Sequence, residues 1–368
     1  MHPVPTETEK IRRLTWRIAH NGANTLFVQL TFFGSVYILF LNELGLPKTR
    51  IGFLLSLVPF SGVLSLLIAP AVARAGVKRI FISCWALRTM VGAFLLLIPW
   101  TMVRFGSELT FVFIAFLIAA FALCRTVGET GAVAWELEVI PAAMRGKYRG
   151  VSTIVETLAA ILAIVIASYA LGRISGLTRF MVPMGVGVVF GVVSVGCALL
   201  SPGGAPNNER EVAHFRQLRV ALRDRNFRRH LGSQGLVILS FGFFSFMPLF
   251  MKEQVGLRDD QIVLLQIGSI AGGLLSSYLW GWLVDRYGSK PVILFSLYLM
   301  ALVPLCWLFM PRYSEWSYTA AIAIAFLGGV ASTGWGVGDY RLIYNDIIPA
   351  ESKTAYTAIY YAWWGLVG

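Results

Sequence analysis

The chain has 368 residues, of which 57% are hydrophobic and 14% charged, and its mean hydropathy is +0.70. Soluble domains carry about 25% charged residues, so the composition excludes a soluble enzyme, and its 13% of aromatic residues excludes a disordered chain. The net charge of +12 would suit nucleic acid only if the charges formed a patch. Four cysteines, all in apolar stretches, are too few for a disulfide framework. The composition indicates an integral membrane protein.

Apolar runs long enough to cross a bilayer recur along the chain. A transmembrane helix needs about 20 such residues, and the runs lack the alternation of a β-barrel, so they predict helices. Eleven runs are found, at 21–42, 51–73, 80–103, 109–135, 150–172, 180–201, 231–251, 261–284, 291–311, 316–338 and 354–368. Residues 1–17 are polar and basic and no small-residue cleavage site follows, which predicts a cytoplasmic tail and a retained first span.

The positions of lysine and arginine predict the orientation. With the N-terminus in the cytoplasm, 21 of the 31 basic residues fall in cytoplasmic segments, 8 in outer loops and the other two inside spans. This asymmetry follows the positive-inside rule and removes nucleic acid as the reason for the positive charge. The compact size and short loops favour a multi-pass protein of a bacterial plasma (inner) membrane, with the lipid bilayer as its surroundings.

A polar segment at 202–230 separates two similar regions, 1–201 and 231–368. It opens with the breaker cluster Pro202-Gly203-Gly204-Ala205-Pro206. Apolar residues then follow at helical spacing among arginines: Val212, Phe215, Leu218 and Leu222. The pattern predicts an amphipathic helix, which either is a solvated linker or lies on the cytoplasmic membrane surface.

Three matches between the two regions indicate an internal duplication. They pair Arg74-x-Gly76-x-Lys78 with Arg286-x-Gly288-x-Lys290, His20-x-Gly22 with His230-x-Gly232, and Ile140-Pro141-Ala142 with Ile348-Pro349-Ala350. The offsets lie between 208 and 212 residues, so we expect two six-helix units related by a pseudo-twofold axis along the membrane normal. Because the sequence stops inside the eleventh run, we expect a C-terminal truncation, with the eleventh helix incomplete and the twelfth missing.

The loop Gly281-Trp-Leu-Val-Asp285-Arg286-Tyr-Gly288-Ser-Lys290 resembles the signature of the major facilitator superfamily (MFS). The first-half copy keeps Arg74 and Gly76 but has Ala73 at the acidic position, and Arg125-x-x-Gly128-Glu129-x-Gly131 resembles the element of the fourth helix. The resemblance implies an all-α fold of two rocking bundles around a central site, and we expect a monomer. It also implies a conformational gate in which Asp285 meets the start of the fifth span, near Arg149 and Gly150. The gate set is Gly281, Asp285, Arg286, Gly288, Lys290, Arg74 and Gly76.

Four charged residues fall inside predicted spans: Arg88, Arg125, Glu129 and Glu156. A charge at mid-membrane costs about 2.5–3.5 kcal/mol on insertion scales, so such residues pair or line a polar cavity. Arg125 and Glu129 are four apart on one helix face, and we expect this pair, with Glu156 as a further carboxylate, to couple transport to protons. The alternative is a structural pair that only allows insertion. Arg88 is expected to bond within its own bundle.

Uncharged polar and aromatic residues on the helices that the family places around the cavity are further candidates for lining it. The expected cavity-lining residues are Asn21, Asn24, Gln29, Gln234, Trp335 and Tyr360. His20, Asp339, Arg341 and Tyr361 belong to the same helices. For each of these residues, the sequence favours a role in hydrogen-bonded packing over contact with a substrate.

The sequence therefore predicts a secondary active transporter that moves a small solute by alternating access, with protons as the coupling ion. It offers no metal-ligand cluster, cofactor motif or catalytic arrangement, so we expect no enzyme activity, no metal and no cofactor. The lack of a Gly-x-x-x-x-Gly-Lys-Ser/Thr loop disfavours a primary pump. The alternative from another class is a non-transporting membrane sensor or receptor on the same fold.

Overall fold

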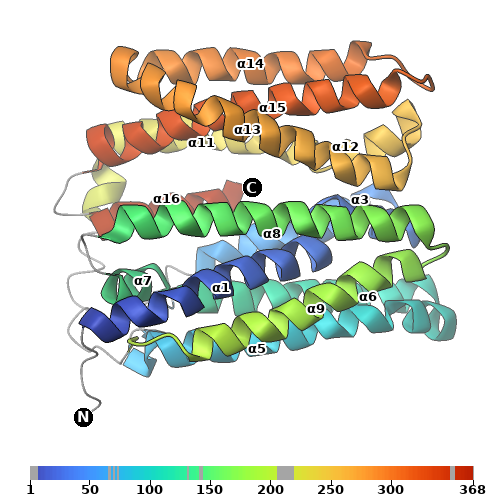
Figure 1. The fold of residues 1–368 in the computed structure, drawn as a ribbon, viewed down its shortest axis with the longest axis horizontal. Helices are drawn as coiled ribbons and strands as arrows, with labels where there is room; N and C mark the ends of the chain where they lie inside the picture. Colours follow the sequence, from blue (N-terminus) through green and yellow to red (C-terminus); the bar gives the residue numbers. More distant parts are fainter. Residues whose placement is uncertain are drawn as a thin grey trace.

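The computed structural model describes residues 7–64, 68, 71–72, 74–130, 132–140, 144–204, 219–348 and 353–367. The secondary structure of these residues consists of helices joined by turns and short loops and contains no strand, which confirms the predicted all-α fold. The long helices run side by side in two groups, with α8 and α16 between them (Figure 1).

The first half comprises the helices up to residue 204. They are α1 (Glu7–Thr31), α2 (Ser35–Glu43), α3 (Lys48–Ser61), η1 (Gly62–Leu64), α5 (Val77–Phe94), η2 (Leu95–Leu97), α6 (Ile98–Glu129), α7 (Ala132–Val139), α8 (Arg145–Arg173) and α9 (Thr178–Leu199). The second half follows from residue 219. It contains α11 (Arg225–Phe244), α12 (Met247–Phe250), the π-helix η4 (Met251–Val255), α13 (Asp259–Tyr287), α14 (Ser289–Phe309), α15 (Ser317–Arg341), the π-helix η5 (Leu342–Ile347) and α16 (Lys353–Val367).

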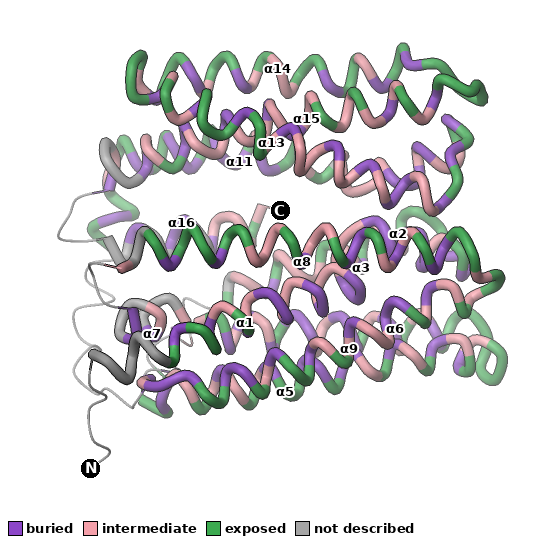
Figure 2. Tube along the Cα trace, viewed as in Figure 1, coloured by how far each residue is buried: buried purple, intermediate pink, exposed green. Residues whose placement is uncertain are grey.

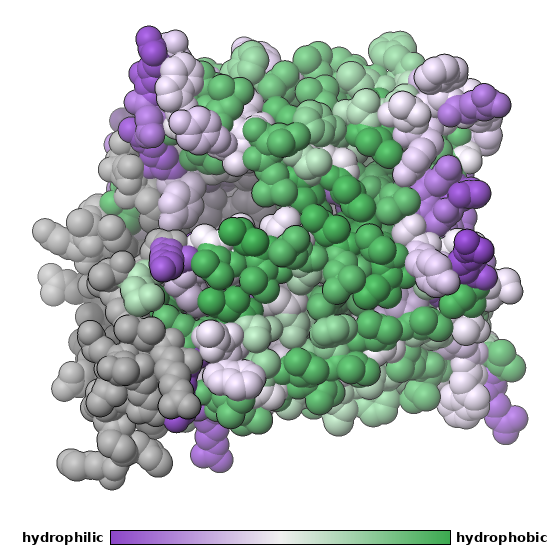
Figure 3. All heavy atoms as spheres, in the orientation of Figure 1, coloured by the Kyte–Doolittle hydropathy of each residue, from purple (hydrophilic) through white to green (hydrophobic). Residues whose placement is uncertain are grey.

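The surface has the character of a membrane protein. In Figure 3 apolar residues cover the middle of the visible face, and polar residues gather at its two ends. Eight helical segments among the described residues are long and apolar enough to cross a membrane. One of them, Val77–Glu129, has 53 residues and turns at Gly106, where φ is +76°, so it has the length of two crossings.

Nine of the eleven predicted runs overlap the eight helical segments that are long and apolar enough to cross a membrane. The runs at 51–73 and 354–368 do not, and part of 51–73 lies outside the described residues. Two further details differ from the prediction. The run predicted at 109–135 is not one helix, because α6 ends at Glu129 and the extended backbone of Thr130 separates it from α7. The polar stretch at 1–17 is not an irregular tail in its described part, because α1 already begins at Glu7, and Leu14 and Arg17 are buried. The predicted amphipathic helix is described only from residue 219, where a helical turn covers 219–223; Val212, Phe215 and Leu218 lie outside the described residues.

Arg17 shows why the first helix extends so far towards the N-terminus. Its side chain is buried, and its guanidinium lies 4.5 Å from the ring centroid of Trp135 and 5.3 Å from that of Phe81. A guanidinium over an aromatic face keeps a favourable electrostatic partner after it leaves water. The sequence placed Arg17 in the polar N-terminal tail. The structure corrects this, because the Arg17 side chain is packed in the core.

The two ends of the molecule are built differently. We call the end with the last residue of α9, Leu199, and the first of α11, Arg225, the linker end, and the end with Glu43 and Asp259 the far end. At the far end, one cluster of buried apolar residues includes side chains of both halves, among them Leu41 and Leu257. At the linker end, the described core residues form separate clusters within each half. The buried positions along each helix are shown in Figure 2.

A close crossing of α13 and α15 holds the second half together. A Cβ atom added to Gly329 would lie 1.9 Å from the backbone oxygen of Ser269, so the backbones touch where this glycine has no side chain. Small residues allow such an approach between transmembrane helices.

We expect Gly329→Ala to destabilise the protein by about 1–3 kcal/mol, because an added methyl group in a filled space forces the helices apart. Gly336, on the same helix, has no atom within 4 Å of its added Cβ, so Gly336→Ala is the matched control. Thermal unfolding in detergent should show a lower midpoint for Gly329→Ala alone. Equal midpoints for the two variants would contradict the crossing.

Candidate functional site

Four charged side chains join the two halves at the far end. Arg179, at the start of α9, lies 2.9 Å from Glu43 of α2 and 3.0 Å from Asp259 of α13. Lys252 of η4 lies 3.3 Å from Glu43 and 3.0 Å from Asp259. Each half thus contributes one cation and one anion to this far-end ion cluster, and every anion contacts a cation of the opposite half. The Asp259 side chain is only 6% exposed, so its charge depends on these partners.

A further ion pair and a hydrogen bond extend the contact between the halves. Lys48 of α3 pairs with Glu253 of η4. Towards the middle of the molecule, Gln266 Nε2 of α13 donates a hydrogen bond to Ser35 Oγ of α2 at 3.0 Å. Gln29, one of the expected cavity-lining residues, borders a cavity of about 10 Å³ beside this bond, which is room for about one water molecule. The far side of the interface is therefore closed.

The pair formed by Arg125 and Glu129 lies at the end of α6. Arg125 Nε donates to Glu129 Oε1 at 2.9 Å, and the guanidinium lies 5.2 Å from the ring centroid of Phe33. The side chains are 36% and 50% exposed, so the ion pair is not buried in its bundle. A half-exposed ion pair in a membrane-spanning helix requires a polar or water-filled space beside it.

Glu156 belongs to a polar row between α1 and α8. Ser152 Oγ donates to Glu156 Oε1 at 2.6 Å, and Asn21 Nδ2 donates to Ser152 Oγ at 2.9 Å. Asn21 also lies 3.4 Å from the Tyr148 hydroxyl. The structure thus brings two residues of the predicted set, Asn21 and Glu156, into one hydrogen-bonded row.

Asn24 is bound inside the first half. Its Oδ1 accepts a hydrogen bond from Arg88, which is 2% exposed and lies 4.1 Å from the ring centroid of Trp85. As expected, Arg88 bonds within its own bundle. Asn24 supplies the acceptor that a buried guanidinium needs.

Gln234 and Tyr360 bind a carboxylate in the second half, and Trp335, one turn before that acid on α15, packs its ring near Trp364, with the ring centroids 6.0 Å apart. Asp339 of α15 accepts hydrogen bonds from Gln234 Nε2 and, at 2.8 Å, from the Tyr360 hydroxyl. His230 Nε2 lies 3.4 Å from Asp339 Oδ1. Asp339 is 4% exposed, so this cluster is the most buried acidic position among the described residues of the second half.

The signature loop joins α13 to α14 at the linker end. Asp285 is 81% exposed and accepts a bond of 2.6 Å from Arg341 of its own half, whereas no atom lies within 4 Å of a Cβ added to Gly150. The expected contact between Asp285 and the start of the fifth span is therefore not formed in this structure. Gly288 has φ of +84°, a value that glycine adopts without strain and that lets the chain turn between the helices.

The other gate residues lie around this loop and its first-half copy. Arg286 lies 5.4 Å from the ring centroid of Trp282, and Lys290 is exposed at the start of α14. Gly281, one turn before Asp285, has open space beside its Cα, so close helix packing does not explain it. In the first half, Gly76 precedes α5 with φ of +92°, and Arg74 is exposed. Both signature glycines, Gly76 and Gly288, thus serve as turns.

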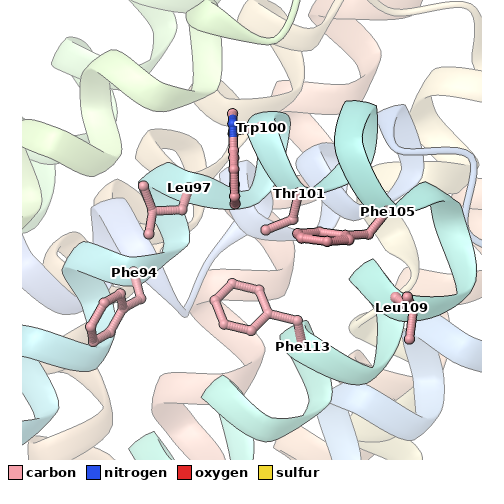
Figure 4. A pocket seen from close by; sticks show the side chains of 7 residues that line it. All are labelled: Phe94, Leu97, Trp100, Thr101, Phe105, Leu109 and Phe113. Atoms are coloured by element: carbon pink, nitrogen blue, oxygen red, sulfur yellow. The ribbon is translucent and has the colours of Figure 1, made fainter.

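A cavity lined mainly by apolar side chains lies away from all of these residues. It has a volume of about 320 Å³ and is formed where α5, η2 and α6 bend at the far end, and its lining contains no charged side chain (Figure 4). Its lining residues are Phe94, Leu97, Trp100, Thr101, Phe105, Leu109 and Phe113. It contains none of the predicted site residues.

Comparison with known proteins identifies the sequence and the fold. A family model described as Major Facilitator Superfamily matches residues 22–368. No curated protein matches the sequence. The structure resembles a bacterial homologue of the human lysosomal transporter Spinster in an inward-facing, unoccupied conformation, at 14% identity and a TM-score of 0.70, over 100% of this chain and 81% of that chain. It also resembles the nucleoside transporter NupG (14% identity, TM-score 0.65, 98% and 89% covered) and a D-xylose–proton symporter (14%, 0.63, 96% and 88%). At these identities the solved structures establish the fold alone.

Proposed function

The chain belongs to the major facilitator superfamily, and from this premise we propose that it is a secondary active transporter. It moves a small solute across a bacterial plasma membrane by alternating access, with its N-terminus in the cytoplasm and protons as the coupling ion. The solute site is the space between the halves, which Asn21, Gln29, Gln234, Trp335 and Tyr360 adjoin from either side.

One observation carries this proposal: within the described residues, the ion pairs that join the halves all lie at the far end, whereas the other close approach, of Gly365 in α16 to Pro59 and Gly62, lies farther along α3 and has no charged partner. Ion pairs and a shared apolar core close the far end, while the cores at the linker end are separate in the described residues. A transporter that exposes its site to one side at a time requires such an asymmetry. In the proposed orientation, the far end is the outer side and the structure is the inward-facing state.

The signature loop is proposed to serve the opposite state. When the linker end closes, Asp285 leaves Arg341 for the second turn of α8, near Arg149 and Gly150, where the charge of Arg149 favours an anion. Arg74 and Gly76 provide the corresponding turn in the first half, where the residue at the acidic position is Ala73. Only the second half then offers a carboxylate for this contact.

The test of transport is flux through the purified protein in liposomes. Nucleosides and pentoses are the first solutes to try, because the structural neighbours include a nucleoside transporter and a D-xylose–proton symporter. We expect counterflow of at least one labelled solute, together with proton movement when a solute gradient is imposed. Specific binding without flux across the solutes tested would support the sensor alternative and contradict transport.

A further inference from the structure

The buried carboxylate of Asp339 has an unusual set of partners. Gln234 Nε2 and the Tyr360 hydroxyl donate to its oxygens, and His230 Nε2 lies 3.4 Å from Oδ1. Within the described part of the chain, His230 is the only basic side chain within ion-pair distance of Asp339. Neither arginine nor lysine compensates the charge there.

The internal repeat shows what has changed at this position. Asp339 follows Glu129 by 210 residues, as His230 follows His20 and Gln234 follows Asn24. The residue one turn before Glu129 is Arg125, but the residue one turn before Asp339 is Trp335. The first-half acid therefore has a permanent cation beside it, and the second-half acid has a tryptophan.

His20 and His230 also have different partners. In the first half, Nδ1 of His20 lies 2.9 Å from the backbone oxygen of Ser194, away from the acid of that half. In the second half, the histidine lies against the acid, and its Nε2 has no hydrogen-bond partner among the described residues. A buried, unpartnered ring nitrogen beside a buried carboxylate is the arrangement in which one proton satisfies both groups.

We propose that Asp339 and His230 together bind one exchangeable proton, at a site separate from Glu129. Without that proton the pair carries a net charge of −1 in a site almost shut off from water, at a large cost in desolvation. With the proton, either an imidazolium faces a carboxylate or both groups are neutral, and the net charge of the pair is zero. The proton belongs to the pair and not to either residue. On release it passes to water, and the pair returns to −1.

The geometry favours a proton over a metal ion. The Gln234 amide and the Tyr360 hydroxyl point hydrogens at the carboxylate, which would repel a cation. Hard cations require several oxygen ligands at about 2.0–2.6 Å. Among the described residues, no group of three or more histidine, cysteine, aspartate or glutamate side chains gathers as metal ligands would.

Among the described residues, the titratable groups that flank this pair have other partners. On α13, Asp285 is paired with Arg341 at the exposed end of α15. On α16, Tyr360 faces the pair directly, while Tyr356 donates to Asp224. Any use of the Asp339–His230 proton for coupling rests on the proposed function, but the binding of the proton does not.

Infrared difference spectra between acidic and alkaline samples of the detergent-purified full chain, without solute, test the proposal. We expect wild-type protein to show a band of a protonated carboxyl or an imidazolium that titrates with pH. Asp339→Asn should remove the whole signal, and His230→Gln should keep a carboxyl band but shift the pH at which it titrates, because the proton is then held by Asp339 alone. Asp285→Asn, which removes an exposed carboxylate of the same half, should leave the titration intact. An unchanged signal in Asp339→Asn, or an unchanged titration in His230→Gln, would overturn the proposal.

Tyr360→Phe provides a test that still applies if the other variants misfold, because it keeps the ring and removes only the hydroxyl that donates to Asp339. A hydrogen bond to a charged group stabilises the ionised form, so its loss should raise the proton affinity about tenfold, with the signal retained. An unchanged titration in Tyr360→Phe would contradict the proposal. Displacement of the proton by sodium ions at constant pH would also contradict it, since that would show a cation site.

Discussion

Replacing Glu129 by glutamine is expected to abolish solute accumulation driven by a proton gradient while leaving solute exchange across the membrane. The pair with Arg125 is half-exposed at the end of α6, so protons can reach the carboxylate. Exchange needs no net proton movement, and glutamine keeps the shape of the side chain without its titratable group. Accumulation and exchange are measured with the same reconstituted protein.

Glu108 provides the matched control for Glu129. It also lies on α6 and pairs with an arginine, Arg50, at 2.9 Å, but its side chain is 74% exposed at the far end. Glu108→Gln should therefore retain accumulation. If Glu129→Gln still concentrates the solute in a pH-dependent way, the Arg125–Glu129 pair is structural and the coupling proton binds elsewhere.

Replacing Arg179 by glutamine is expected to open the far end. Arg179 bridges two anions from opposite halves, Glu43 and Asp259. Hydrogen bonds to charged groups contribute about 1.5–3 kcal/mol each, and every 1.4 kcal/mol changes an equilibrium tenfold. The ratio of open to closed far ends should rise at least about tenfold.

The measurement is the labelling rate of a cysteine at Ser35 by a water-soluble thiol reagent, in a background without the four native cysteines. Ser35 is buried beneath the far-end ion cluster and accepts the bond from Gln266. Arg258→Gln is the control, since Arg258 pairs at the same end with Asp260 of its own half. Equal labelling rates in Arg179→Gln and Arg258→Gln would show that the cluster does not hold the halves together.

Hydropathy and the repeat predicted most of the fold, because a helix in lipid must be long, apolar and internally hydrogen-bonded. The details that escaped prediction depend on tertiary contacts. Arg17 is a basic residue near a terminus in the sequence, and only the ring of Trp135 shows that it belongs to the core. The bend at Thr130 ends α6 within a run that is apolar almost throughout.

The sequence could identify the polar and charged residues of the candidate site, but not which of them contact one another. The far-end ion cluster brings together three separate stretches of the sequence, around Glu43, Arg179 and Lys252–Asp259. By hydropathy these residues belong to outer loops or span ends, so nothing in the sequence pairs them. Asp339 was visible as an acid in the tenth span, but its pairing with His230 depends on how α11 packs near α15. Asp285 matched a family signature, and its partner Arg341 could not be foreseen, because the two residues are 56 positions apart and meet only through the packing of α13 against α15.

Alternating access is tested most directly by measuring distances across both ends of the same protein by pulsed electron resonance. Spin labels at the exposed positions Thr49 and Gln254 report on the far end, and labels at Lys147 and Tyr287 report on the linker end. Compared with wild type, Arg179→Gln should show a longer Thr49–Gln254 distance together with a shorter Lys147–Tyr287 distance. A longer far-end distance with an unchanged linker-end distance would mean local loosening and would contradict the account.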